Sequence, residues 1–172
     1  MFGRELALRA LRDAGCSDQV IQHCLTVERV ALKIARKIDE NGHEIDLGLV
    51  SVGAILHDIG RAKTHGIRHG VIGGETLHQM GLSEFAGFAE NHLGAGILAN
   101  EAKALGLPER DFTPCTLEEK VVAYADKLVM GNRETSYEQA VKWFRSELGE
   151  KHPAIKRFEE LRLEIKNLSA ER

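Results

Sequence analysis

The stretch LGLVSVGAILHD, residues 47–58, decides the fold and raises the question of function. Residues 47–56 are apolar on nearly every side, with no alternation of apolar and polar positions. Such a run is typical of a helix buried inside a helical protein. Asp46 is suited to cap its first turn, and Gly60 is suited to end it. The sequence therefore predicts a buried helix whose C-terminal end carries His57 and Asp58.

Apolar residues recur at helical spacing on both sides of this stretch. Ser17, Ser83 and the capping-box sequences beginning at Thr116 and Ser136 mark helix starts, and Pro153 suits a first turn. The predicted flanking helices cover residues 5–14, 18–40, 69–80, 84–92, 99–105, 117–130, 137–148 and 153–168. No segment has a convincing β-strand pattern. We expect an all-α, single-domain bundle of about seven to nine helices over residues 1–172.

Composition excludes several classes of protein. The chain has 172 residues, of which 43% are hydrophobic, so it can bury a core without disulfides. Its net charge of -3 and its lack of a basic arm give no indication of nucleic-acid binding. The N-terminal sequence is not a signal peptide, and no apolar run approaches the roughly 18 residues of a membrane span. Three cysteines without a C-x-x-C pair indicate reduced thiols, so we expect a cytoplasmic protein that does not enter membranes.

His57 and Asp58 are unusual at the end of an apolar helix. A carboxylate there is costly unless it is paired or bound to a metal, and it lies at the end of the helix dipole that favours cations. The alternative is a half-exposed helix end with Asp58 in solvent. The dipeptide alone does not decide between the two.

Two further residues change the balance. His23 lies beside the apolar stripe of its helix, and Asp126 lies beside the apolar face of another. Taken singly, His23 could be a hydrogen-bonded core histidine, and Asp126 could pair with a neighbouring lysine. Together with His57 and Asp58, they offer two imidazoles and two carboxylates from three helices to one cation. Nitrogen and oxygen ligands without thiolate favour Fe, Mn, Zn, Ni or Co over Mg or Ca, and four ligands leave positions open for catalysis.

The same residues resemble a known family. His23, the HDIG run at 57–60 and Asp126 in AYADKL resemble the H…HD…D signature of the HD-domain metal-dependent phosphohydrolases, over about residues 17–135. The resemblance implies an HD-like helical fold, with a metal-binding core over 17–135 followed by C-terminal helices over 136–170.

Two-metal members of that family carry further histidines, which His69 in HGVIGGETL and His92 in ENHLGAG resemble. By this resemblance Asp58 bridges two metals, His23, His57 and Asp126 hold the first, and His69 and His92 hold the second. Surface positions are the alternative for these last two histidines. Leu93 stands where several two-metal relatives have another histidine, and no Gly-Tyr-Pro motif occurs, so the cyclic-dinucleotide phosphodiesterase subgroup is disfavoured.

The implied reaction is hydrolysis of a nucleotide or another small phosphate ester by metal-activated hydroxide, without a covalent intermediate. Predicted phosphate-binding residues are Arg61, Lys63 and Arg68, with Arg133 as a weaker candidate, because guanidinium groups suit phosphate. A solvated basic loop is the alternative. The predicted catalytic residues are Asp58, Arg61 and His65, the last as acid for the leaving group.

Two other functions compete with this prediction. Some relatives with the same ligand set use a mixed-valence di-iron centre to activate oxygen, and sequence does not separate them from hydrolases. A non-catalytic, nucleotide-sensing bundle is the third reading, although such members usually lose ligands and this chain keeps them. Trp143 and Phe144 are candidates for a homo-oligomer contact or for the core.

Overall fold

The computed structural model describes residues 3–170 and confirms an all-α fold. Its α-helices are α1 (Arg4–Asp13), α2 (Asp18–Glu40), α3 (Leu47–Leu56), α4 (His69–Gln79), α5 (Ala86–Glu90), α6 (Ala99–Ala104), α7 (Leu117–Lys127), α8 (Tyr137–Leu148) and α9 (Pro153–Ser169). Short 3-10 turns are η1 (Ile59–Ala62), η2 (Ser83–Phe85) and η3 (Leu93–Ala95). Residues 1–2 and 171–172, the ends of the predicted domain, lie outside the described residues.

The apolar stretch forms the central helix α3, as predicted. The Asp46 side chain accepts a hydrogen bond from the backbone N–H of Leu49 and caps its first turn. α3 packs against α1, α2, α5 and α7, and Ile55 and Leu56 are fully buried. The helix ends at Leu56, two residues before the predicted end, and the chain turns through His57 and Asp58 into η1. This turn brings both side chains into the interior.

The turn is held in place by close backbone packing between η1 and α4. An added Cβ on Gly60 would lie 1.9 Å from the carbonyl oxygen of His69 and 2.6 Å from the backbone nitrogen of Gly73. Only glycine allows this approach. Gly60 therefore joins the segment that carries Asp58 to the first turn of α4, which carries His69.

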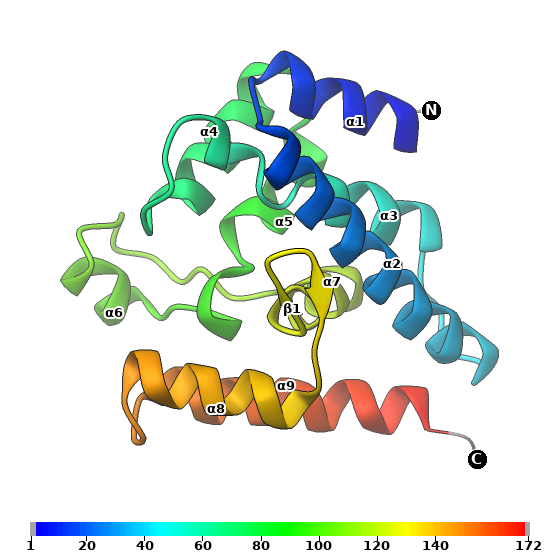
Figure 1. The fold of residues 1–172 in the computed structure, drawn as a ribbon, viewed down its shortest axis with the longest axis vertical. Coiled ribbons are helices and arrows are strands. Elements are labelled where there is room, and N and C mark those ends of the chain that lie inside the picture. Colours follow the sequence, from blue (N-terminus) through cyan, green and yellow to red (C-terminus); the bar gives the residue numbers. More distant parts are fainter. Residues whose placement is uncertain (1–2, 171–172) are drawn as a thin grey trace.

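α8 and α9 form an antiparallel pair that lies beneath the other helices in Figure 1. The pair packs on α7 through Phe158, which is fully buried and contacts the rings of Tyr124, Tyr137 and Phe144. α9 also contacts α2 and η3. The C-terminal helices are thus an integral part of the packing around α7.

The structure also differs from the sequence predictions at other helix ends. The predicted helix 117–130 stops at Lys127, and the two-residue strands β1 (Val129–Met130) and β2 (Arg133–Glu134) follow as a hairpin that no pattern predicted. Ser83 does not cap a helix; its hydroxyl pairs with His78. Of the two predicted capping boxes, the one at Ser136 is complete.

The other predicted capping box, at Thr116, is only half formed. The Thr116 hydroxyl accepts from the backbone N–H of Glu119, but the Glu119 carboxylate accepts from Cys115 and Asn91 instead of Thr116. The contact with Asn91 ties the start of α7 to the end of α5. Among residues 3–170, no helix has both the length and the apolar character needed to cross a membrane.

Candidate metal centre

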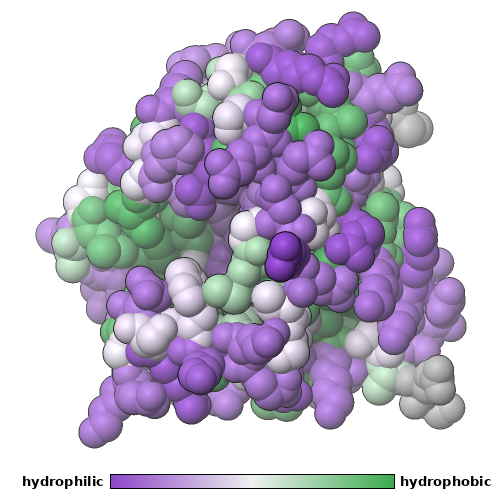
Figure 2. Space-filling view, in the orientation of Figure 1, coloured by the Kyte–Doolittle hydropathy of each residue, from purple (hydrophilic) through white to green (hydrophobic). Residues whose placement is uncertain are grey.

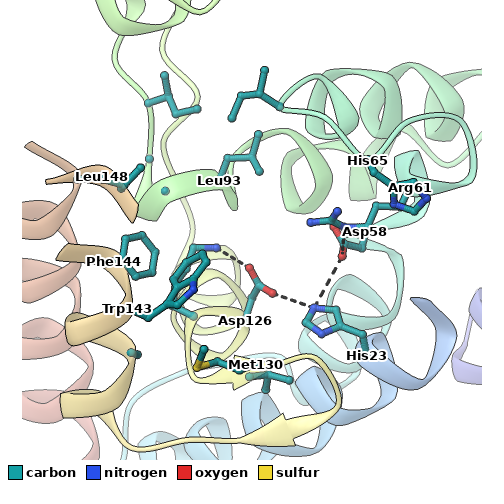
Figure 3. A pocket seen from close by; sticks show the side chains of 18 of the residues that line it. His23, Asp58, Arg61, His65, Leu93, Asp126, Met130, Trp143, Phe144 and Leu148 are labelled. Atoms are coloured by element: carbon teal, nitrogen blue, oxygen red, sulfur yellow. Dashed lines mark hydrogen bonds and ion pairs between the residues drawn. The ribbon is translucent and has the colours of Figure 1, made fainter. Parts of the chain in front are cut away.

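Six predicted ligands from five segments of the chain meet at one place. His23 comes from the second turn of α2, and Asp126 comes from the last turn of α7. The turn after α3 supplies His57 and Asp58, and His69 is the first residue of α4. The remaining ligand, His92, follows α5. Figure 3 shows His23, Asp58 and Asp126 pointing toward one another.

All four histidine rings are oriented in the same way. The Nδ1 atom of each lies within hydrogen-bond distance of a backbone carbonyl oxygen. The pairs are His23 with Gly131 at 2.6 Å, His57 with Ala54 at 2.7 Å, His69 with Gly66 at 2.9 Å and His92 with Ala89 at 2.8 Å. A carbonyl accepts only, so Nδ1–H is the donor and Nε2 of a neutral ring keeps its lone pair. Metal-binding histidines are commonly held by this kind of second hydrogen bond.

The Nε2 atoms of His23 and His57 face the same carboxylate oxygen. Asp126 Oδ1 lies 3.0 Å from His23 Nε2 and 3.4 Å from His57 Nε2. Asp58 Oδ2 lies 3.7 Å from each of the same two nitrogens. His23, His57 and Asp126 therefore form a group close enough to hold one cation, with Asp58 beside it.

A second group lies on the other oxygen of Asp58. Asp58 Oδ1 is 3.1 Å from His69 Nε2 and 3.5 Å from His92 Nε2, and these two nitrogens are 3.2 Å apart. His57, Asp58 and His92 also satisfy the distances of a cation site. The two oxygens of Asp58 thus face two different sets of imidazoles.

Some buried polar atoms of this cluster have no partner among the protein atoms that the structure describes. His57 Nε2 and Asp58 Oδ1 are buried without a hydrogen-bond partner among the described residues. Lone pairs that face carboxylate oxygens at these distances repel one another unless a proton or a cation lies between them. Burial lowers the pKa of His92 to about 4, which keeps its imidazole neutral and able to bind a metal. The orphaned atoms and the donor set fit a divalent transition metal.

The two carboxylates stay ionised. Burial acts to raise the pKa of Asp58, but the neighbouring imidazoles, His57 first, hold it well below its ordinary value. For Asp126 burial again acts upward, and Lys127 followed by His23 and His57 holds the pKa well below the ordinary value. Lys127 forms an ion pair with Asp126 Oδ2, and Arg61 Nε lies 2.6 Å from Asp58 Oδ2.

The cluster opens into a cavity of about 920 Å³. Arg61, His65 and Lys127 line it beside His23, Asp58 and Asp126. Figure 3 shows this charged end opposite Trp143, Phe144 and Leu148 of α8. In Figure 2 a hydrophobic area faces solvent on the left of the molecule, beside α6.

Three of the predicted phosphate-binding residues lie elsewhere. Lys63, Arg68 and Arg133 are exposed and are not part of the cavity wall. The Arg68 guanidinium donates to the carbonyl of Gly106 and so ties the loop before α4 to the end of α6. Sequence reasoning placed these cations near the site because they lie close to the ligands along the chain, but their side chains leave it.

Two features of the site were missing from the sequence-based interpretation. Lys127 lines the cavity. The only feature of the sequence that pointed to this lysine was its place directly after Asp126 in the ADK sequence. The β1–β2 hairpin supplies the Gly131 carbonyl that orients His23 across 108 positions of chain. Gly131 has a positive φ of 60°, which favours glycine, but no pattern in the sequence connects it with His23.

Comparison with known proteins agrees with this geometry. A family model described as HD domain matches residues 20–131. An uncharacterized protein of Methanocaldococcus jannaschii is 48% identical over 165 residues, which cover 95% of this chain and 97% of that protein. Two proteins named tRNA (cytidine(56)-2'-O)-methyltransferase are also similar, at 40% identity over 76% of this chain in Thermoplasma volcanium and 37% over 94% in Picrophilus torridus. The matched regions span only 38% and 46% of those longer proteins. No solved structure matches the chain significantly.

Proposed function

The chain belongs to the HD domain family, and from this premise we propose that it is a metal-dependent hydrolase of a small phosphate ester, preferably a nucleotide. One observation carries the proposal. Four histidines whose Nδ1 atoms are tied to backbone carbonyls turn their Nε2 atoms toward the buried carboxylate of Asp58 and the partly buried carboxylate of Asp126. A cavity large enough for a small organic phosphate opens directly onto this cluster.

We assign two divalent cations to the cluster. His23, His57, Asp126 and Asp58 Oδ2 would hold the first, and His69, His92 and Asp58 Oδ1 would hold the second. Distances of 3.1 and 3.5 Å from Asp58 Oδ1 to the second pair of imidazoles support a bridging role for Asp58. The ligand chemistry suits Fe, Mn, Zn, Ni or Co.

When bound, a pair of such cations lowers the pKa of water and neutralises charge on a phosphoryl group. The residues of the chain do the rest. Arg61, which pairs with Asp58, can instead donate two parallel hydrogen bonds to phosphate once cations neutralise that carboxylate. Lys127, beside Asp126, offers a second positive charge at the same end of the cavity. His65 lines the cavity near Arg61 and is the candidate to protonate the leaving oxygen.

The preference for a nucleotide has separate support. The cavity of about 920 Å³ exceeds what a phosphate group alone would occupy, so the ester carries a sizeable organic part. Two relatives bear names that assign them to tRNA methylation, which suits a substrate drawn from nucleotide chemistry. A test panel should therefore include nucleoside monophosphates, nucleoside diphosphates and cyclic phosphates.

The test combines metal analysis with hydrolysis assays. Purified protein loaded separately with Mn, Fe, Co, Ni or Zn is expected to hold two cations per chain and to hydrolyse an aryl phosphate or a member of the nucleotide panel. His69→Ala and His92→Ala are expected to retain one cation and to lose most activity. His78→Ala, in the exposed last turn of α4, is the matched control and should keep both.

Three outcomes would contradict the proposal. Two cations retained in both His69→Ala and His92→Ala would remove the second site. No hydrolysis with any of the metals would remove the activity. A mixed-valence di-iron signal in the iron-loaded protein, combined with absent hydrolysis, would favour oxygen activation instead.

A further inference from the structure

The cavity has an apolar wall opposite the charged cluster. α8 supplies Trp143, Phe144 and Leu148, and the hairpin supplies Met130. Met130 lies near the end of the family match over residues 20–131, whereas the three residues on α8 lie outside it. Most of the wall is therefore a feature that α8 adds to the metal centre.

Trp143 and Phe144 are adjacent but lie in different surroundings. Phe144 is 4% exposed and stacks on Phe158 in the core. Trp143 is 45% exposed, lies edge-on to Phe144 with ring centroids 5.4 Å apart and lines the cavity. Packing in the core accounts for the position of Phe144, but much of the indole of Trp143 makes no contact with the core. A large aromatic side chain exposed in a cavity is suited to contact a ligand ring.

An ion pair, which carries no net charge, lies on another part of the cavity wall. Arg157 on α9 contacts both carboxylate oxygens of Glu101 on α6, at 2.9 and 3.1 Å. Both residues line the cavity. Such a pair offers hydrogen-bond donors and acceptors without net charge, which suits the edge of a heterocycle rather than a second phosphate or a hydrocarbon chain.

We propose that Trp143 and the Glu101–Arg157 pair determine specificity by binding a heteroaromatic base, whose phosphate lies at the metal cluster. The base lies against the indole of Trp143, and its polar edge faces the ion pair. This inference rests on the proposed function for the position of the phosphate. The base-binding wall itself rests only on the residues of α6, α8 and α9.

The chain contains a single tryptophan, so Trp143 reports directly on this wall. Fluorescence titrations of the full metal-loaded chain would use adenosine, adenosine monophosphate, ribose 5-phosphate and hexyl phosphate. Adenosine and its monophosphate are expected to quench the emission, and ribose 5-phosphate is expected to leave it unchanged. Adenosine carries no phosphate, so its binding is measured whether or not the protein is a hydrolase.

Substitutions test the same contact by a second route. Trp143→Ala should lower the ratio of kcat/KM for adenosine monophosphate to that for ribose 5-phosphate by roughly 10-fold, and Trp143→Phe should restore most of it, because base stacking needs an aromatic face. Glu101→Gln keeps the shape of the side chain and should change the order of preference among bases. Leu163→Ala removes an exposed side chain of α9 that does not line the cavity and should leave the ratio unchanged.

The outcomes separate this inference from the proposed function. Quenching by adenosine without hydrolysis of any ester would leave the base site standing and remove the hydrolase. Hydrolysis of an aryl phosphate without any response to adenosine would do the reverse. Quenching by hexyl phosphate alone would overturn the base site, because an aliphatic chain would then cover the wall. A dimer in solution that Trp143→Ala converts to monomer would also overturn it, because a second copy of the chain would then cover the wall.

Discussion

Asp58 is the residue on which the site depends. It is buried, its two oxygens face different pairs of imidazoles, and its protein counter-ion is Arg61 at 2.6 Å. A buried carboxylate is tolerated only when cations or hydrogen bonds compensate it. The geometry accordingly gives Asp58 a place in both proposed cation sites, whereas each histidine contributes one Nε2.

Replacing Asp58 should therefore affect both cations together. We expect Asp58→Ala to lower metal affinity roughly 100-fold or more at each site and to abolish hydrolysis, since a ligand matters at least as much as the groups that orient ligands. Metal content per chain and activity on an aryl phosphate are the measurements. Asp39→Ala removes an exposed carboxylate from α2 and is the control. A fully metallated, active Asp58→Ala protein would refute the bridging role.

The thiols give a second prediction at this scale. Burial raises the pKa of Cys16 to about 11 and that of Cys24 well above its ordinary value, whereas Cys115 is exposed. Because the thiolate is the reactive form, a neutral alkylating agent at pH 7 should label one site per native chain, at Cys115, and three after unfolding. Peptide mass spectrometry locates the label. Rapid labelling of Cys24 in the native protein would contradict its burial.

At the scale of elements, the site is built by contacts between segments that are distant in the chain. η1 presses on α4 at Gly60, so that Asp58 and His69 meet, and the β1–β2 hairpin orients His23. His57, Asp58 and His92 lie in turns, and His69 begins a helix, so the positions of these ligands depend on how the segments pack.

Gly60→Ala tests this packing. The added methyl group would lie 1.9 Å from a backbone oxygen that cannot rotate away, so η1 and α4 must separate. We expect a destabilisation of about 1–3 kcal/mol or more, from overpacking, together with weaker binding of the second cation. Urea denaturation and metal analysis measure the two effects. Gly66→Ala, in the neighbouring loop, is the control: its added Cβ would lie 3.7 Å from the nearest atom, so stability and metal binding should not change. A Gly60→Ala protein with unchanged stability and metal binding would show that η1 is not fixed at this point.

The sequence predicted elements better than the contacts between them. Periodicity and caps located α2, α3 and α8 to within a few residues, because apolar stripes and Ser or Asp caps are local signals. The hairpin after α7 has two-residue strands and no alternation to detect. Arg68 shows the same limit, since its bond to Gly106 depends on how two loops approach each other. Side-chain direction in a loop is not encoded by spacing.

At the scale of the whole molecule, the cavity joins two parts of the chain. α2, the turn after α3, and α7 supply the charged end, and α8 and α9 supply the opposite wall. Phe158 on α9 fixes the second part to the first through its contact with Tyr124 on α7. Stability of the fold and occupation of the site are therefore linked.

His23 allows this linkage to be measured against pH. Burial acts to lower its pKa, but Asp126 and the carbonyl of Gly131 outweigh it, so the pKa is raised above the ordinary value of ~6.5. In the metal-free protein, the stabilisation from protonated His23 is full below that ordinary value and is lost as pH rises through the raised pKa. A bound cation needs the unprotonated Nε2 instead, so metal binding releases this proton and strengthens as pH rises. As pH rises through the raised pKa of His23, the stabilisation from the protonated histidine is therefore lost while the stabilisation from bound metal increases.

We therefore expect the difference in Tm between metal-loaded and chelator-treated protein to grow as pH rises through the raised pKa of His23. At a free metal concentration 100 times the Kd, each site adds about 2.7 kcal/mol, which corresponds to roughly 5–10 °C for a chain of this size. Calorimetry at several pH values, with and without chelator, gives the difference directly. His43→Gln, which alters a histidine in the loop before α3, should leave the pH dependence unchanged. A difference in Tm that falls with rising pH would mean that the cations do not compete with the proton on His23.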